Sequence, residues 1–116
     1  MSEGSVEFVR VAARADIADG AYVIAEVGEY SILVVNLEGE FFAVENRCTH
    51  LASPLEGGRV RRGRIACPLH GAVYDLRTGA PLGGSLAPRG LRTFAARIEG
   101  DDVSVKATPN PPGTSR

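Results

Sequence analysis

The chain has 116 residues, an apolar content of 44% and a formal net charge of −1. This length suits one domain with a modest core, and the near-neutral charge gives no reason to expect nucleic-acid binding. No segment approaches the roughly 20 apolar residues of a membrane-spanning helix, and the first residues lack a basic leader followed by an apolar run. We therefore expect a soluble, cytoplasmic protein with no membrane partner.

Short stretches rich in β-branched and aromatic residues, separated by glycine or acidic turns, predict an all-β fold. The expected strands cover residues 6–12, 21–27, 30–37, 41–45, 91–98 and 102–107. Turns are expected at Asp19-Gly20, Glu38-Gly39 and Glu99-Gly100-Asp101, and a single helical turn at 14–18.

Residues 46 to about 90 interrupt these strands and contain every cysteine and histidine of the chain. Within them, Val60 and Ile65 are expected to pair across a tight Arg62-Gly63 turn. We predict a small β-sandwich or barrel over residues 1–108 with the unit 46–90 inserted as a subdomain. Residues 109–116, rich in proline, are expected to form a flexible polar tail.

The cysteines and histidines fall into two boxes, Cys48-Thr49-His50 and Cys67-Pro68-Leu69-His70, separated by sixteen residues. Two thiolates and two imidazoles form the ligand set of a Rieske [2Fe–2S] cluster. The same four residues also match the number of ligands in a tetrahedral zinc site, although zinc fingers usually pair Cys with Cys and His with His. A third interpretation is that they are ordinary buried residues.

Histidine ligands change the redox chemistry of such a cluster. With two ferric ions, two sulfides and two thiolates the oxidised cluster is neutral, so it accepts an electron more easily than a cluster held by four thiolates. Its reduction potential lies at roughly −150 to +300 mV, against about −400 mV for plant-type ferredoxins. Pro68 and Gly71 favour the tight backbone turn that such a box requires.

Taken with the segments 48–51 and 63–79, the boxes make the sequence similar to Rieske ferredoxins, the small electron-transfer components of bacterial ring-hydroxylating oxygenases. The resemblance implies that Cys48 and Cys67 bind one iron and that His50 and His70 bind the other, nearer the surface. It also implies a third loop over the cluster at 83–88. The partners of such a ferredoxin would be a flavoprotein reductase and the terminal oxygenase of an aromatic dioxygenase system. We expect a monomer, because an electron shuttle benefits from a free cluster face.

The sequence departs from high-potential Rieske proteins at the places where those stabilise the reduced cluster. Ser53 and Leu69 stand where they carry a disulfide, and Ala72 stands where they carry a serine. We therefore expect a potential in the lower part of the Rieske range. Tyr74 keeps a hydroxyl in the position from which a tyrosine reaches a cysteine sulfur, and packing alone is an equal alternative.

Both histidines are assigned to the metal, so none remains for a general base or for the iron site of an oxygenase. We therefore expect an electron carrier and not an enzyme. The alternatives are the small Rieske-like subunit of an assimilatory nitrite reductase, a zinc-stabilised interaction module and a purely structural β-domain.

Charge is distributed unevenly along the chain. Residues 1–45 contain nine acidic and two basic residues, a balance of −7, and residues 46–116 contain five acidic and eleven basic, a balance of +6. Many of the latter lie near the boxes: Arg47, Arg59, Arg61, Arg62 and Arg64. They either steer acidic redox partners or pair with Glu40, Glu45 or Glu56.

Overall fold

The computed structural model describes residues 8–48, 54–68, 71–82 and 90–110. It contains one short 3-10 helix, η1 (Arg14–Asp16), and these strands: β1 (Phe8–Ala13), β2 (Tyr22–Val27), β3 (Tyr30–Leu37), β4 (Glu40–Glu45), β5 (Arg59–Arg61), β6 (Arg64–Ala66), β7 (Val73–Asp75), β8 (Thr93–Glu99) and β9 (Asp102–Pro109). The predicted all-β class is confirmed.

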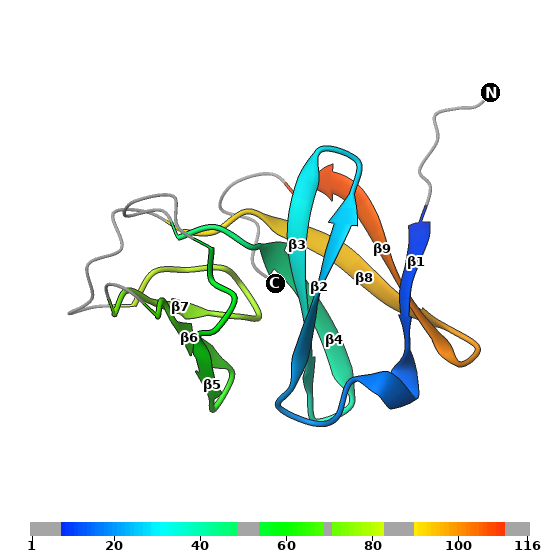
Figure 1. The fold of residues 1–116 in the computed structure, drawn as a ribbon, viewed down its shortest axis with the longest axis horizontal. Helices are drawn as coiled ribbons and strands as arrows, with labels where there is room; N and C mark the ends of the chain where they lie inside the picture. The colour runs from blue at the N-terminus through cyan, green and yellow to red at the C-terminus, as the bar shows by residue number, and fades with distance from the viewer. Residues whose placement is uncertain (1–7, 49–53, 69–70, 83–89, 111–116) are drawn as a thin grey trace.

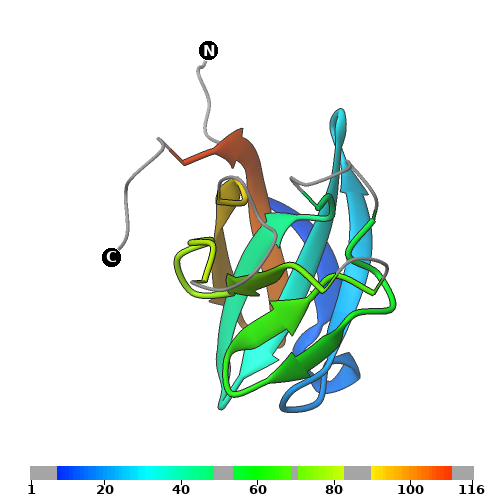
Figure 2. The ribbon, with the colours of Figure 1, turned by 90° about the vertical axis from the view of Figure 1, so that its left-hand side faces the viewer.

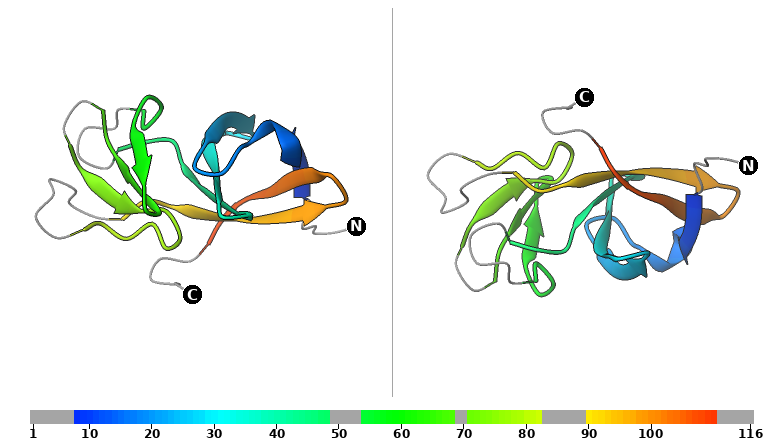
Figure 3. Two further views of the ribbon diagram at one scale, coloured as in Figure 1. Left: turned by 90° about the horizontal axis from the view of Figure 1, so that it is seen from below. Right: turned by 90° about the horizontal axis from the view of Figure 1, so that it is seen from above.

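Six strands form one antiparallel sheet in the order β1-β9-β8-β4-β3-β2. Its two outer strands, β1 and β2, contact each other, so the sheet is nearly closed into a barrel (Figures 1 and 3). Because a closed sheet leaves no strand edge exposed, this arrangement protects the barrel from pairing with other chains.

A second, three-stranded antiparallel sheet has the order β5-β6-β7. It lies in the chain between β4 and β8, which pair directly with each other in the barrel through Ala43 and Phe94. We call it the small sheet. It covers one side of the barrel (Figures 1 and 2), as expected of an inserted subdomain.

Strand β3 is buried on both of its faces, because successive side chains of a strand point to opposite sides. Ile32 and Val34 belong to the core inside the barrel. Leu33 and Val35 belong to the core that the barrel shares with the small sheet. This arrangement explains the continuous apolar run at 32–35, which shows no alternation with polar residues.

The predicted turns are confirmed. Glu38 and Gly39 both have positive φ, 56° and 92°, and so do Arg62 and Gly63, 53° and 78°. Two such residues in a two-residue hairpin loop match the right-handed twist of the flanking strands. The register places Val60 opposite Ile65, as expected.

The structure contains one strand that the sequence did not predict and changes one predicted boundary. Strand β7 was not expected, since three residues give too short a pattern to predict it. The tail begins later than predicted because β9 extends to Pro109 and Asn110 donates to Thr93 through its backbone and its side chain, at 2.7 and 2.9 Å. Residues 6 and 7 of the first predicted strand, and residues 111–116 of the predicted tail, lie outside the described residues.

Candidate metal centre

The two cysteines lie where the barrel and the small sheet meet. Cys48 follows β4 by three residues, and Cys67 directly follows β6. Both are buried, with exposed fractions of 0% and 3%, in the core shared by the two sheets. The fold therefore brings together two thiols that are nineteen residues apart in the sequence.

The second box is the connection between β6 and β7. The backbone N–H of Cys67 donates to Ala72 O at 2.7 Å, and the N–H of Gly71 donates to Cys67 O at 3.0 Å. Gly71 has a φ of +75°, a conformation that glycine adopts without steric cost. The expected role of Gly71 in a tight turn is confirmed.

Tyr74 serves both purposes that the sequence left open. Its side chain is fully buried in the shared core. Its hydroxyl lies 3.5 Å from Cys48 Sγ, within hydrogen-bonding distance for sulfur. When Cys48 is a thiolate, the hydroxyl is the donor, since a thiolate has no proton to give.

Asn46 precedes Cys48 by two residues and binds the turn at 55–58. Its Oδ1 accepts from the N–H of Leu55 at 2.8 Å and of Glu56 at 2.9 Å, and its Nδ2 donates to Ser31 Oγ at 3.2 Å. The sequence interpretation missed Asn46. The available signal was an asparagine just after a strand, a residue whose side chain commonly binds nearby backbone groups.

Tyr22 of β2 binds the second half of this turn, Gly57 and Gly58. Its hydroxyl accepts from the N–H of Gly57 at 2.8 Å and donates to Gly58 O at 3.0 Å. Nothing in the sequence indicated this contact, since it joins residues about 35 positions apart.

Four arginines of the small sheet differ from the arginines of the barrel in their pairing with carboxylates. Arg10, Arg92 and Arg97 of the barrel region each pair with a carboxylate, of Asp102, Glu45 and Glu99 respectively. Within the described ranges, no carboxylate pairs with the exposed residues Arg59, Arg61, Arg62 and Arg64. The expected pairing with Glu45 is wrong, because Glu45 binds Arg92 instead.

His50 and His70, predicted as the remaining ligands, lie outside the described residues, as do residues 83–88 of the predicted third loop. The described half of the site fits an iron–sulfur cluster. It offers two cysteine sulfurs in an apolar core, and a thiolate is costly in such surroundings unless a cation neutralises it. A phenol near one sulfur supplies the hydrogen bond that such a charge requires.

A comparison with protein families matches residues 7–95 to the Rieske [2Fe-2S] domain. The chain therefore belongs to the Rieske [2Fe–2S] family, whose cofactor is that cluster. Among the helices of the described part of the chain, none has the length and apolar character to span a membrane.

Its relatives include ferredoxin components of aromatic dioxygenase systems. The biphenyl 2,3-dioxygenase ferredoxin component of Rhodococcus jostii (strain RHA1) is 38% identical over 97 residues, which cover 83% of this chain and 89% of the relative. The ferredoxin component of the naphthalene 1,2-dioxygenase/salicylate 5-hydroxylase systems of Ralstonia sp. is 34% identical over 78% of this chain and 86% of the relative. The chain also matches 15% of mouse apoptosis-inducing factor 3 at 34% identity over 80% of its own length, so the domain also occurs within longer proteins.

Solved structures agree with this assignment. The ferredoxin of carbazole 1,9a-dioxygenase from Nocardioides aromaticivorans IC177 has a TM-score of 0.82 and 28% identity over 87% of this chain and 98% of its own. A chain from the complex of reduced oxygenase and oxidised ferredoxin in carbazole 1,9a-dioxygenase has a TM-score of 0.83 and 25% identity, with 91% and 98% covered. The prediction of a Rieske ferredoxin, an electron carrier and not a catalytic subunit, is confirmed.

Proposed function

We propose that Cys48, His50, Cys67 and His70 hold one [2Fe–2S] cluster. We further propose that the chain carries single electrons from a flavoprotein reductase to the terminal oxygenase of an aromatic-ring-hydroxylating dioxygenase. The observation that carries this proposal is the burial of both cysteines in one core, in a chain that belongs to the Rieske family. When bound, the cluster accepts one electron and gives it up again.

Residues of the chain prepare the site for that change of charge. Leu33, Val35 and Leu55 belong to the same buried apolar core as the two cysteines, and such a core excludes water. The hydroxyl of Tyr74 donates to Cys48 Sγ, and this bond strengthens when the sulfur becomes more negative. The tight Cys67–Ala72 connection keeps the second box close to the sheet.

The partners are inferred from the names of relatives. A solved complex of a similar ferredoxin with an oxygenase supports the terminal oxygenase as electron acceptor. The reductase follows from electron balance, because a one-electron carrier needs a donor for each electron it delivers. We place the protein in the cytoplasm, where a reducing environment keeps cysteines available for iron, and propose a monomer that leaves the cluster accessible to each partner in turn.

We propose a midpoint potential below zero, in the lower part of the Rieske range of roughly −150 to +300 mV. Ala72 is fully buried and offers no hydroxyl beside the second box, where high-potential relatives carry a serine. Both cysteines of the chain are assigned to iron, so no disulfide braces the loops. A redox titration that finds a midpoint well above zero would overturn this part of the proposal.

Electron transfer is tested with the purified protein and with the flavoprotein reductase and the oxygenase of a biphenyl dioxygenase system. The proposal predicts that the reductase bleaches the visible absorption of the ferredoxin and that oxygenase restores it. The matched control is Cys48→Ser, which is expected to remove both responses. A colourless protein that binds one zinc ion would contradict the proposal and support an interaction module.

A further inference from the structure

The turn at residues 55–58 connects the two segments that carry the cysteines. On one side, Asn46, two residues before Cys48, accepts the N–H groups of Leu55 and Glu56. The other side of the turn lies against the second box. The turn therefore touches both cysteine segments.

Contact between the turn and the second box is close. A Cβ at Gly58 would lie 2.4 Å from Ala66 O, and a Cβ at Gly57 would lie 3.9 Å from Pro68 Cγ. Ala66 and Pro68 flank Cys67 in the sequence. Since Gly58 leaves no room for a side chain, a shift of the turn would displace the backbone on both sides of Cys67.

The barrel anchors this turn through two side chains. Tyr22 extends from β2 and uses its hydroxyl twice, as acceptor for Gly57 N–H and as donor to Gly58 O. Asn46 is tied to β3 through Ser31, by its backbone N–H at 2.8 Å and by its amide group. We call these side chains and the turn that they hold, Tyr22, Asn46 and residues 55–58, the turn clamp.

We propose that Tyr22 and Asn46 are positioning residues for the cluster, and that the turn clamp holds the two cysteine segments at the separation that one iron requires. This inference rests on the proposed function, since it needs Cys48 and Cys67 to share a cluster. The clamp supplies by hydrogen bonds the cross-connection that a disulfide cannot supply here, because the chain contains no third or fourth cysteine.

The Tyr22 hydroxyl can be separated from the Tyr22 ring. The ring is half-buried against the shared core, and a phenylalanine would fill the same space. Tyr30 of the neighbouring strand provides a matched control, because its ring packs edge-on against Phe94 in the barrel core, with centroids 5.2 Å apart. Tyr22→Phe and Tyr30→Phe therefore each remove one tyrosine hydroxyl, and of these two hydroxyls only that of Tyr22 binds the turn.

The experiment compares reconstituted wild type, Tyr22→Phe and Tyr30→Phe proteins in excess iron chelator, by the decay of the visible absorption. Tyr22→Phe is expected to lose its cluster about fivefold to tenfold faster, as the loss of one or two hydrogen bonds implies, and Tyr30→Phe to stay within about twofold of wild type. Hydrogen exchange in the peptide spanning 55–58 should accelerate in the first variant alone. The paramagnetic signal of its reduced cluster should also broaden, because looser cysteines give a wider range of ligand geometries.

Substitutions of Asn46 give an independent test of the turn clamp, in which one variant removes the hydrogen-bond acceptor and a conservative variant keeps it. Asn46→Leu removes the acceptor for Leu55 and Glu56, and we expect cluster loss to accelerate about tenfold or more. Asn46→Asp keeps an acceptor oxygen for both N–H groups, so its rate should stay within about threefold of wild type.

Equal rates of cluster loss in Tyr22→Phe and Tyr30→Phe would overturn the turn clamp, and so would faster loss without faster exchange at 55–58. Equal rates of cluster loss in Asn46→Leu and Asn46→Asp would also overturn the turn clamp. A wild-type protein that binds no cluster at all is a different result, because it refutes the proposed function itself.

Discussion

The barrel fills its interior with side chains of its own strands, whereas the small sheet shares its interior with the outside of the barrel. Ile32, Val34 and Val103 face each other inside the barrel. Strands β5, β6 and β7 have three residues each, and the core beneath them includes Cys48 and Cys67. Strands of three residues are at the short end of the range in globular proteins, so the small sheet has little apolar surface of its own to bury. The comparison leads us to expect that the small sheet needs both the barrel and the cluster to stay folded, while the barrel, which has a core of its own, stays folded without the cluster.

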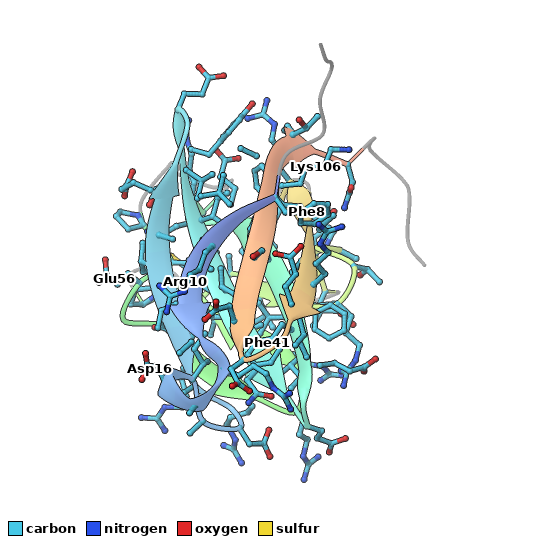
Figure 4. All side chains as sticks on the ribbon, turned by 90° about the vertical axis from the view of Figure 1, so that its right-hand side faces the viewer. Phe8, Arg10, Asp16, Phe41, Glu56 and Lys106 are labelled. Atoms are coloured by element: carbon cyan, nitrogen blue, oxygen red, sulfur yellow. The ribbon has the colours of Figure 1, made fainter. Side chains whose placement is uncertain are left out.

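The two regions also differ in their surface charge. Figure 4 shows Arg10 on β1 of the barrel, and this residue pairs with Asp102 of β9 at 2.9 Å. In the small sheet, Arg61 and Arg64 lie directly opposite each other across β5 and β6. Like charges in this position are destabilising. In the barrel, Glu99 and Asp102 also lie opposite each other, but each of them pairs with an arginine, whereas Arg61 and Arg64 have no carboxylate partner among the described residues. A binding role for the exposed arginines offers a reason for this unfavourable arrangement.

Removal of the cluster is the change with the largest expected effect. After iron is chelated, we expect amide exchange in the small sheet to accelerate roughly a hundredfold or more, while the barrel strands stay protected. Hydrogen exchange measured on peptides of β3 and β6 distinguishes the two regions. Equal loss of protection in both peptides would show that the barrel also depends on the cluster.

Two neighbouring valines sharpen the comparison. Val34 and Val35 are both fully buried, but Val34 faces the barrel core and Val35 faces the core that contains the cysteines. Either change to alanine is expected to lower the free energy of unfolding by about 1–3 kcal/mol, measured by denaturant titration.

Only Val35→Ala should also accelerate loss of the cluster under chelation, since Val34→Ala alters the opposite face of β3. If both variants lose the cluster at the same rate, the two cores are coupled and the regions are not distinct.

The exposed arginines are expected to act on the rate of electron transfer. Replacement of both Arg61 and Arg64 by glutamine should slow electron transfer between the ferredoxin and an acidic redox partner about threefold to tenfold at low salt. The rate is measured by stopped flow. The difference should disappear at high ionic strength, because salt screens exposed charges.

Arg10 and Arg14, both exposed on the barrel side, give a control with the same change in net charge. A similar slowing in that control double variant would attribute the effect to total charge and not to the face of the small sheet.

The smallest expected effect concerns Tyr74. Replacement by phenylalanine keeps the buried ring and removes the hydroxyl 3.5 Å from Cys48 Sγ. We expect the midpoint potential to fall by roughly 20–60 mV, since a hydrogen bond to sulfur favours the reduced, more negative cluster and is worth about 1 kcal/mol. An unchanged potential in a redox titration would leave Tyr74 with a packing role alone.

Much of the fold was predictable because its signals are local. The Glu38-Gly39 and Arg62-Gly63 turns follow from the glycine in each pair, which adopts positive φ without steric cost, and the strands around them follow from β-branched runs. The boxes themselves predicted the family. The double-sided burial of β3 was not predictable, since a continuous apolar run does not reveal which residues face which core.

The hydrogen bonds that hold the site in place join residues that are far apart in the sequence. Tyr22 binds backbone groups of Gly57 and Gly58, and such contacts require no particular side chain at the far end and leave no pattern in one sequence. The same reason applies to Asn110, whose bonds to Thr93 extend the closing strand pair beyond its apolar residues.

The most direct test of the account is electron–nuclear double resonance on the reduced protein, labelled with nitrogen-15 in histidine alone. We predict coupling to two histidine nitrogens in wild type, reduced to one in His50→Cys and in His70→Cys. A reduced cluster without histidine coupling would contradict the assignment of the two boxes as its ligands.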